Sequence, residues 1–140
     1  MKVLLDTNIV LDVLLDREPF VDLAKEIFGL IEEGKIEGYL CATSVTTLHY
    51  LIGRSTHNKE EANKIIEKLL TLFEVSSVNK KILYEASLNN GADYEDSVIY
   101  TSAFASKINM IVTRDKKGFK ASKVSVLMPK EFLAFYTSGV

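Results

Sequence analysis

Four aspartates stand at the ends of predicted strands or at the start of a predicted helix: Asp6, Asp93, Asp96 and Asp115. Asp6 and Asp115 each follow a short apolar segment that is typical of a buried strand. Residues three apart face the same side of a helix, so Asp93 and Asp96 can point together. Carboxylates that meet at one place repel each other unless a cation lies between them. Oxygen ligands of this kind suit Mg²⁺ or Mn²⁺, which can activate water for attack on a phosphodiester.

Each of these acids also has an ordinary structural interpretation. An aspartate at a helix start, with an acid three residues later, resembles a capping box, and the helix dipole favours negative charge there. Taken alone, Asp93 and Asp96 are more typical of capping than of catalysis. Asp115 can be a turn residue that bonds neighbouring amides, and Asp6 can cap a helix. A metal site therefore requires that these side chains converge.

The elements that must position the acids alternate between short apolar strands and helices. Strands are predicted at residues 2–5, 39–42, 74–78, 110–113 and 124–127. Helices are predicted at 9–15, with Thr7 or Asn8 as cap, from Pro19 to Gly34, and at 43–52. A fourth helix follows a polar break at 53–59. The last three are predicted at 80–88, with a stop at 89–91, at 93–107 and at 131–136. The predicted buried faces are Phe20, Leu23, Ala24, Ile27, Phe28 and Ile31 in the second helix, and Ala62, Ile65, Ile66, Leu69, Leu70 and Phe73 in the fourth.

Strands separated by helices run parallel, because each crossover returns the chain along the sheet. The predicted fold is therefore α/β, a three-layer α/β/α sandwich with a central parallel sheet of about five strands. The functional crevice of such a sheet lies beyond the carboxyl ends of its strands. Asp6 and Asp115 are thus expected at the same rim, although they are far apart in the sequence.

Length and composition favour a single cytoplasmic domain spanning residues 1–140. The chain is 47% hydrophobic and 26% charged, as in ordinary globular proteins. Its one cysteine, Cys41, excludes an internal disulfide framework and suits a reducing compartment. No apolar run approaches the ~20 residues needed to cross a bilayer, and the early carboxylate of Asp6 is unlike a secretory signal. No association with a membrane is expected.

The net charge of −2 gives no overall signature of a nucleic-acid binder. Phosphate affinity must then come from bound metal or from a local basic segment. Residues 114–123 offer such a segment, with Arg114, Lys116, Lys117, Lys120 and Lys123. A solvated loop is the alternative interpretation. His49 lies in an apolar helical stretch, where a half-buried histidine with a hydrogen-bond partner is expected rather than a zinc ligand.

Three motifs carry a resemblance to a known family. The run Val3-Leu4-Leu5-Asp6-Thr7-Asn8 resembles the opening strand of PIN-domain proteins. Asp93-Tyr94-Glu95-Asp96-Ser97, a helix of small residues, and then the run from Ile111 to Phe119 are similar to that family's second half. In this order and at these distances the motifs match across nearly the whole chain. The resemblance is closest to the bacterial and archaeal group that includes VapC-like toxins of toxin–antitoxin pairs.

The resemblance implies a parallel sheet flanked by helices and an acidic pocket for Mg²⁺ or Mn²⁺. It also implies hydrolysis of phosphodiester bonds, usually in RNA. By position, Asp6, Asp96 and Asp115 match the family's metal-site acids, and Asp93 is similar to an additional acid found in part of the family. Members commonly work as homodimers and are inhibited by an antitoxin encoded beside them.

Other positions bear on the same site. Asn8 and Thr113 match polar positions that support the acids, Thr113 by bonding a ligand carboxylate or water. Many PIN proteins carry a glutamate on the helix after the second strand, but no acid lies between Leu40 and Lys59 here. Thr46 or Thr47 is expected at that position, and a hydroxyl is a weaker ligand than a carboxylate. Asp93 or Glu95 can compensate by supplying a fourth acid from another direction.

We therefore expect a metal-dependent ribonuclease whose RNA is contacted by Arg114, Lys116 and Lys117, with a toxin role suggested by the resemblance. The chief alternative is a degenerate PIN domain that binds RNA or a protein, because the helix glutamate is missing. A third interpretation, an aspartate-based phosphatase, requires a second acid where this chain has Asn8.

Overall fold

The computed structural model describes residues 1–89 and 93–139 and contains a five-stranded parallel sheet. The strands are β1 (Lys2–Leu5), β2 (Glu37–Cys41), β3 (Glu74–Ser76), β4 (Met110–Val112) and β5 (Ser125–Leu127). Their order across the sheet is β3-β2-β1-β4-β5, and every neighbouring pair is parallel. The predicted α/β architecture with a central parallel sheet is thus confirmed. The helix stop expected at Asn90 and Gly91 lies outside the described residues.

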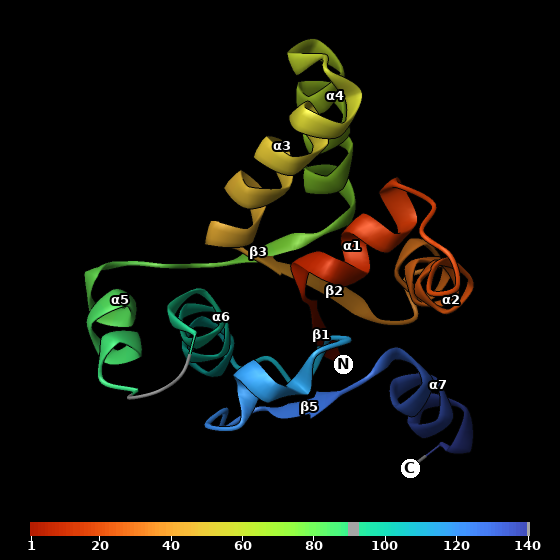
Figure 1. The fold of residues 1–140 in the computed structure, drawn as a ribbon. Helices are drawn as coiled ribbons and strands as arrows, with labels where there is room; N and C mark the ends of the chain where they lie inside the picture. Colours follow the sequence, from red (N-terminus) through yellow and green to blue (C-terminus); the bar gives the residue numbers. More distant parts are fainter. Residues whose placement is uncertain (90–92, 140) are drawn as a thin grey trace.

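Helices cover both faces of the sheet (Figure 1). They are α1 (Thr7–Leu14), α2 (Val21–Glu32), α3 (Ala42–Thr56), α4 (Lys59–Leu72), α5 (Lys80–Ser87), α6 (Tyr94–Ala105) and α7 (Pro129–Ser138), with a 3₁₀ turn η1 at Lys116–Phe119. Successive strand residues point to opposite faces, so Val3 and Leu5 join the core under α1–α4 and α7, whereas Leu4 joins the core under α5 and α6. No helix within the described residues is long and apolar enough to span a membrane.

Two predictions about the helices are wrong. The polar segment 53–59 does not break the chain at Gly53, because α3 continues to Thr56 and ends at His57, which has a left-handed φ of 55°. Polar residues do not end a helix unless packing or capping favours an end. The last turn of α3 is largely solvent-exposed, so it can contain polar side chains and remain helical. Phe20 and Leu70, expected on buried faces, are both exposed.

Phe20 is exposed because it forms the outer layer of an ion-pair cluster around Asp12. Asp12 is fully buried, and its carboxylate accepts hydrogen bonds from Arg17 Nε at 2.9 Å and from Arg114 Nε at 2.7 Å. The Arg114 guanidinium lies 3.8 Å from the centre of the Phe20 ring. Because Arg114 immediately precedes Asp115, this cluster fixes the chain after β4 against α1.

We predict that Asp12→Asn lowers the free energy of unfolding by about 2–3 kcal/mol, because it leaves the cations of Arg17 and Arg114 without their buried counter-charge. Urea unfolding would measure the loss. The matched control is Asp16→Asn, which removes an exposed ion pair with Lys25 and should cost less than about 0.5 kcal/mol. Equal losses in the two variants would show that the Asp12 cluster does not anchor the fold.

Candidate functional site

The carboxyl ends of the neighbouring strands β1 and β4 bring Asp6 and the segment of Asp115 to one rim of the sheet. Leu5 pairs with Val112, and the Asp6 amide donates to the Val112 carbonyl at 2.9 Å. Asp6 is only 7% exposed. One of its carboxylate oxygens accepts the amide of Thr7 at 2.8 Å, so Asp6 caps α1. This confirms the structural interpretation given for Asp6, whereas Thr7 and Asn8, the other predicted caps, do not cap the helix.

The hydroxyl of Thr113 links Asp6 to the Asp115 segment. It donates to the second carboxylate oxygen of Asp6 at 2.7 Å and accepts the amide of Asp115 at 3.1 Å. The Asn8 side chain lies beside it, donating to the Thr113 hydroxyl at 3.4 Å and accepting the Arg114 amide at 3.4 Å. Thr113 and Asn8 therefore connect both strand ends, as a supporting role for them requires.

The start of α6 supplies the next acids. Asp93 caps this helix by accepting the amide of Asp96 at 3.1 Å, which is the capping geometry that its spacing also allowed. Asp96 packs against Gly118 of η1 so closely that a methyl group at Gly118 would overlap its carboxylate. Asp115 in turn caps η1 by accepting the amide of Lys117 at 3.2 Å. The η1 turn, which we did not predict, thus brings the Asp115 segment against α6.

Glu95, which lies on α6, is the acid of the group that faces α3. Its carboxylate accepts a hydrogen bond of 3.4 Å from the hydroxyl of Thr47. Thr47 is one of the two residues that the resemblance to PIN-domain proteins places where many of them carry a glutamate. An acid on α6 therefore reaches the α3 position at which this chain lacks one. The sequence indicated Glu95 only as an alternative to Asp93, because the spacing of the two helices could not be inferred.

The electrostatics of the group match the predicted repulsion. The pKa of Asp96 is raised to about 7 by burial first, and then by the charges of Asp6, Asp93, Glu95 and Asp115. Burial likewise raises the pKa of Asp6, against the hydrogen bonds from Thr113 and Thr7 that lower it. Glu95 and Asp115 raise the Asp6 pKa further. The negative charges of this group therefore act on Asp6 and Asp96, and a cation bound among the acids would reduce the repulsion.

The donor chemistry fits a hard divalent cation in an open site. Within residues 1–89 and 93–139, no three acidic, histidine or cysteine side chains already enclose a point where a metal ion could sit. Such a closed cage is typical of sites built wholly from protein ligands. Mg²⁺ instead keeps several waters and is usually held by one or two carboxylates. Oxygen donors at an exposed rim, with Asp93 and Asp115 open to solvent, are of that type.

The basic side chains that follow β4 make different contacts. The Arg114 guanidinium is bonded to Asp12, and Lys116 pairs with Glu131 at 3.2 Å. Lys117 is exposed next to Asp115. Arg114 thus has a structural role that the sequence did not indicate, and contact of these side chains with RNA stays a prediction. His49 is half-buried and bonded to Asn63 at 2.6 Å, which confirms the expectation for it.

Comparison with known proteins agrees with this geometry. A family model described as the PIN domain matches residues 2–117. The fold is similar to a chain in the crystal structure of VapBC2 from Rickettsia felis bound to a promoter DNA fragment, at 18% identity and a TM-score of 0.62, covering 91% of this chain and 97% of that chain. No curated protein matches significantly in sequence.

Two further solved structures share the fold. FitAcB from Neisseria gonorrhoeae is 22% identical, with a TM-score of 0.63 and coverage of 91% of this chain and 98% of that chain. A toxin–antitoxin complex from Klebsiella pneumoniae is 17% identical, with a TM-score of 0.67 and coverage of 91% and 97% respectively. At these identities the similarity is evidence for the fold alone.

We predict that Asp96→Asn stabilises the metal-free protein at about pH 8. Because the pKa of Asp96 is raised on folding, the folded chain binds this proton more tightly than the unfolded chain, and stability falls as pH rises from about 4 to about 7. After allowance for solvent screening, the gain should be about 1–2 kcal/mol at about pH 8, and it should vanish near pH 4. Urea unfolding in a chelator measures it, and unchanged or lower stability at the higher pH would contradict it.

Proposed function

The chain belongs to the PIN-domain family, and on that premise we propose that it is a Mg²⁺- or Mn²⁺-dependent ribonuclease. The observation that carries the proposal is the place of Asp6 at the carboxyl rim of the parallel sheet, where the Thr113 hydroxyl ties it to the Asp115 segment. The charges of Glu95 and Asp115 act there on both Asp6 and Asp96. Ligand sites in open α/β sheets lie at this rim. Carboxylates that raise one another's pKa are a recognised sign of a functional site.

In this proposal Asp6, Asp96 and Asp115 hold the metal, one or two of them directly and the rest through metal-bound water, and Asp93 serves as an additional ligand or orients water. A divalent cation bound there supplies activated water and neutralises charge on the phosphate. The protein orients the acids through hydrogen bonds, since both oxygens of Asp6 are fixed by Thr113 and Thr7. Lys117, exposed beside Asp115, offers a positive charge to the RNA backbone.

We further propose that Glu95 takes the place of the missing glutamate on α3. The hydroxyl of Thr47 holds its carboxylate at 3.4 Å. Glu95 also contributes to the raised pKa values of both Asp6 and Asp96, so its charge lies close to theirs. The acid thus enters from α6, and Thr47 supports it.

The biological role that fits this proposal is the toxin of a toxin–antitoxin pair, acting as a homodimer and inhibited by an antitoxin. Structures that share the fold include a toxin–antitoxin complex and VapBC2. One alternative keeps a specific observation in its favour. Thr47 stands where many PIN proteins carry a glutamate, which favours a degenerate domain that binds RNA or a protein without cutting.

Asp115→Asn should abolish RNA cleavage and leave the fold intact, because it removes a ligand charge from an exposed side chain. Asp6→Asn should also abolish cleavage. Gel analysis of a labelled RNA in Mn²⁺ measures the rate, and circular dichroism checks the fold. Asp22→Asn, an equal change of charge on the exposed side of α2, is the control. If the Asp115 variant cuts RNA at the normal rate, the metal-site assignment is wrong.

Glu95→Gln should weaken Mn²⁺ binding about tenfold, because it removes an acid that adds to the negative field of the site. Isothermal titration calorimetry measures the affinity, and Glu67→Gln on the exposed face of α4 is the matched control. Wild-type affinity in the Glu95 variant would exclude Glu95 from the site. No saturable Mn²⁺ binding by the unaltered protein at submillimolar metal would instead favour the degenerate, binding-only domain.

A further inference from the structure

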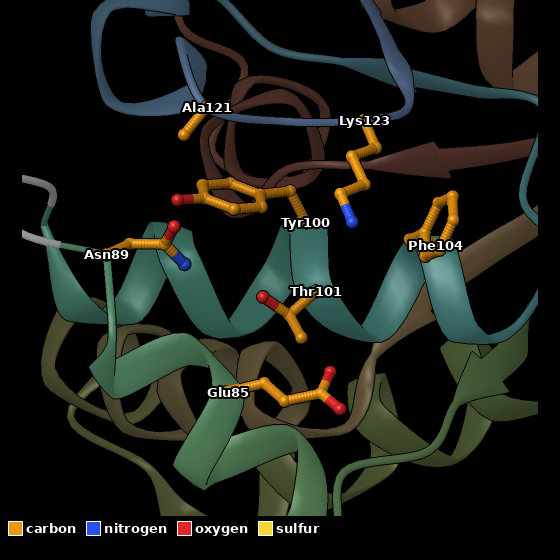
Figure 2. Close-up of a pocket in the computed structure, with 7 residues that line it drawn as sticks. All are labelled: Glu85, Asn89, Tyr100, Thr101, Phe104, Ala121 and Lys123. Carbon is orange, nitrogen blue, oxygen red and sulfur yellow. The ribbon is translucent and has the colours of Figure 1, made fainter.

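A cavity of about 390 Å³ lies along α6, between α5 and the chain that leads into β5 (Figure 2). Its volume is within the range of small-molecule sites, roughly 300–1,000 Å³. The side chains that matter to its chemistry are Glu85, Asn89, Tyr100, Thr101, Phe104 and Lys123. None of them belongs to the acidic group described above.

The cavity continues from the acids along the same helix face. Tyr100 and Phe104 follow Asp96 by four and eight residues, which places them about 6 and 12 Å further along the axis of α6. The chain after Asp115 runs beside the helix over the same length. Gly118 contacts Asp96, the Phe119 ring lies 6.2 Å from that of Tyr100, and Lys123 Nζ lies 5.1 Å from the Phe104 ring. The cavity therefore lies about one to two helical turns from Asp96 along α6.

The Tyr100 hydroxyl indicates that a polar group is missing from this cavity. The residue is 4% exposed, and its hydroxyl has no hydrogen-bond partner among the described residues. A buried hydroxyl without a partner is costly, and in most proteins such groups are paired. A ligand, or a water that a ligand displaces, would satisfy it.

The remaining side chains define what the occupant must offer. Phe104 is 55% exposed and presents an aromatic ring, and Lys123 extends its amine between Tyr100 and Phe104 (Figure 2). Lys123 donates hydrogen bonds only, whereas the Glu85 carboxylate accepts them only. An anion alone would be repelled by Glu85. A purely apolar group would leave the Tyr100 hydroxyl without a partner and would make no use of the charges of Lys123 and Glu85.

We propose that this cavity is a subsite for one unpaired nucleobase of the RNA strand held at the acidic group. A base combines a π-face that can stack on Phe104 with donors for Glu85 and with acceptors for Lys123 and Tyr100. The displacement of about one helical turn from Asp96 to Tyr100 is comparable with one nucleotide of an extended single strand. This subsite rests on the proposed ribonuclease function, since it takes the strand that the acids would cut.

The test is RNA binding without catalysis, measured with Mn²⁺ present in the Asp115→Asn background, to which each cavity and control variant is added. The probe is a short fluorescein-labelled single-stranded RNA, and its affinity is followed by fluorescence anisotropy. Tyr100→Phe, Phe104→Ala and Lys123→Gln should each weaken binding about fivefold or more, as loss of base stacking or base contacts does. Tyr50→Ala and Lys64→Gln, exposed residues of α3 and α4, are the matched controls and should bind as the Asp115→Asn protein does.

A second probe separates base recognition from contact with the backbone. It is an oligomer of abasic sugar-phosphate units with the length and charge of the RNA. Tyr100→Phe and Phe104→Ala should leave its affinity unchanged. Equal weakening toward both probes, or unaltered RNA affinity in all cavity variants, overturns the nucleobase subsite. Neither result touches the ribonuclease proposal, which depends on the loss of cleavage in Asp115→Asn.

Discussion

Repulsion among carboxylates at the carboxyl end of the sheet is the constraint that the surrounding structure must accommodate. Burial raises the pKa values of Asp6 and Asp96, and the charges of Glu95 and Asp115 raise them further. Such an arrangement costs stability in the absence of a counter-ion. Asp6, Asp115 and Glu95 are each tied to backbone or hydroxyl donors, and the Asp96 carboxylate packs against Gly118. These donors belong to elements already fixed by the core on both faces of the sheet.

Hydrogen bonds at the ends of the strands hold Asp6 and Asp115 in place. Asp6 accepts the amide of Thr7 and the hydroxyl of Thr113, and Asp115 caps the turn that follows β4. The segment after β4 is held in addition by Arg114, which reaches back to the buried Asp12 of α1. A buried ion pair is weak evidence for net stability. Here its effect is geometric, since it sets where the chain lies immediately before Asp115.

The chain also differs from the usual PIN pattern in a physically coherent way. Thr47 on α3 is short and neutral, whereas Glu95 on α6 is long and charged, and the two meet at 3.4 Å. In the proposed site, a carboxylate supplied by α6 therefore takes the place of one supplied by α3. On the side of η1, Gly118 leaves room for the Asp96 carboxylate, because a side chain at this position would overlap it.

The sequence by itself determined the sheet, its parallel strands and most helix positions, because apolar periodicity and strand–helix alternation depend on local residues. It also identified the acids, because each stands at the end of a strand or the start of a helix. It offered Asp6, Thr7 and Asn8 as caps of α1 without choosing among them, and it did not determine the length of α3 or the exposure of Phe20. These depend on packing partners, such as Arg114 over Phe20, that are distant along the chain.

Only the tertiary structure decided how the acids meet and what lies beside them. The contact of Thr47 with Glu95, the approach of Gly118 to Asp96 and the ion pair of Asp12 with Arg114 all join residues more than twenty positions apart. No local pattern encodes such distances, because they follow from how helices pack on the sheet. The cavity beyond Asp96 is of the same kind, since it exists only where α5, α6 and the chain before β5 come together.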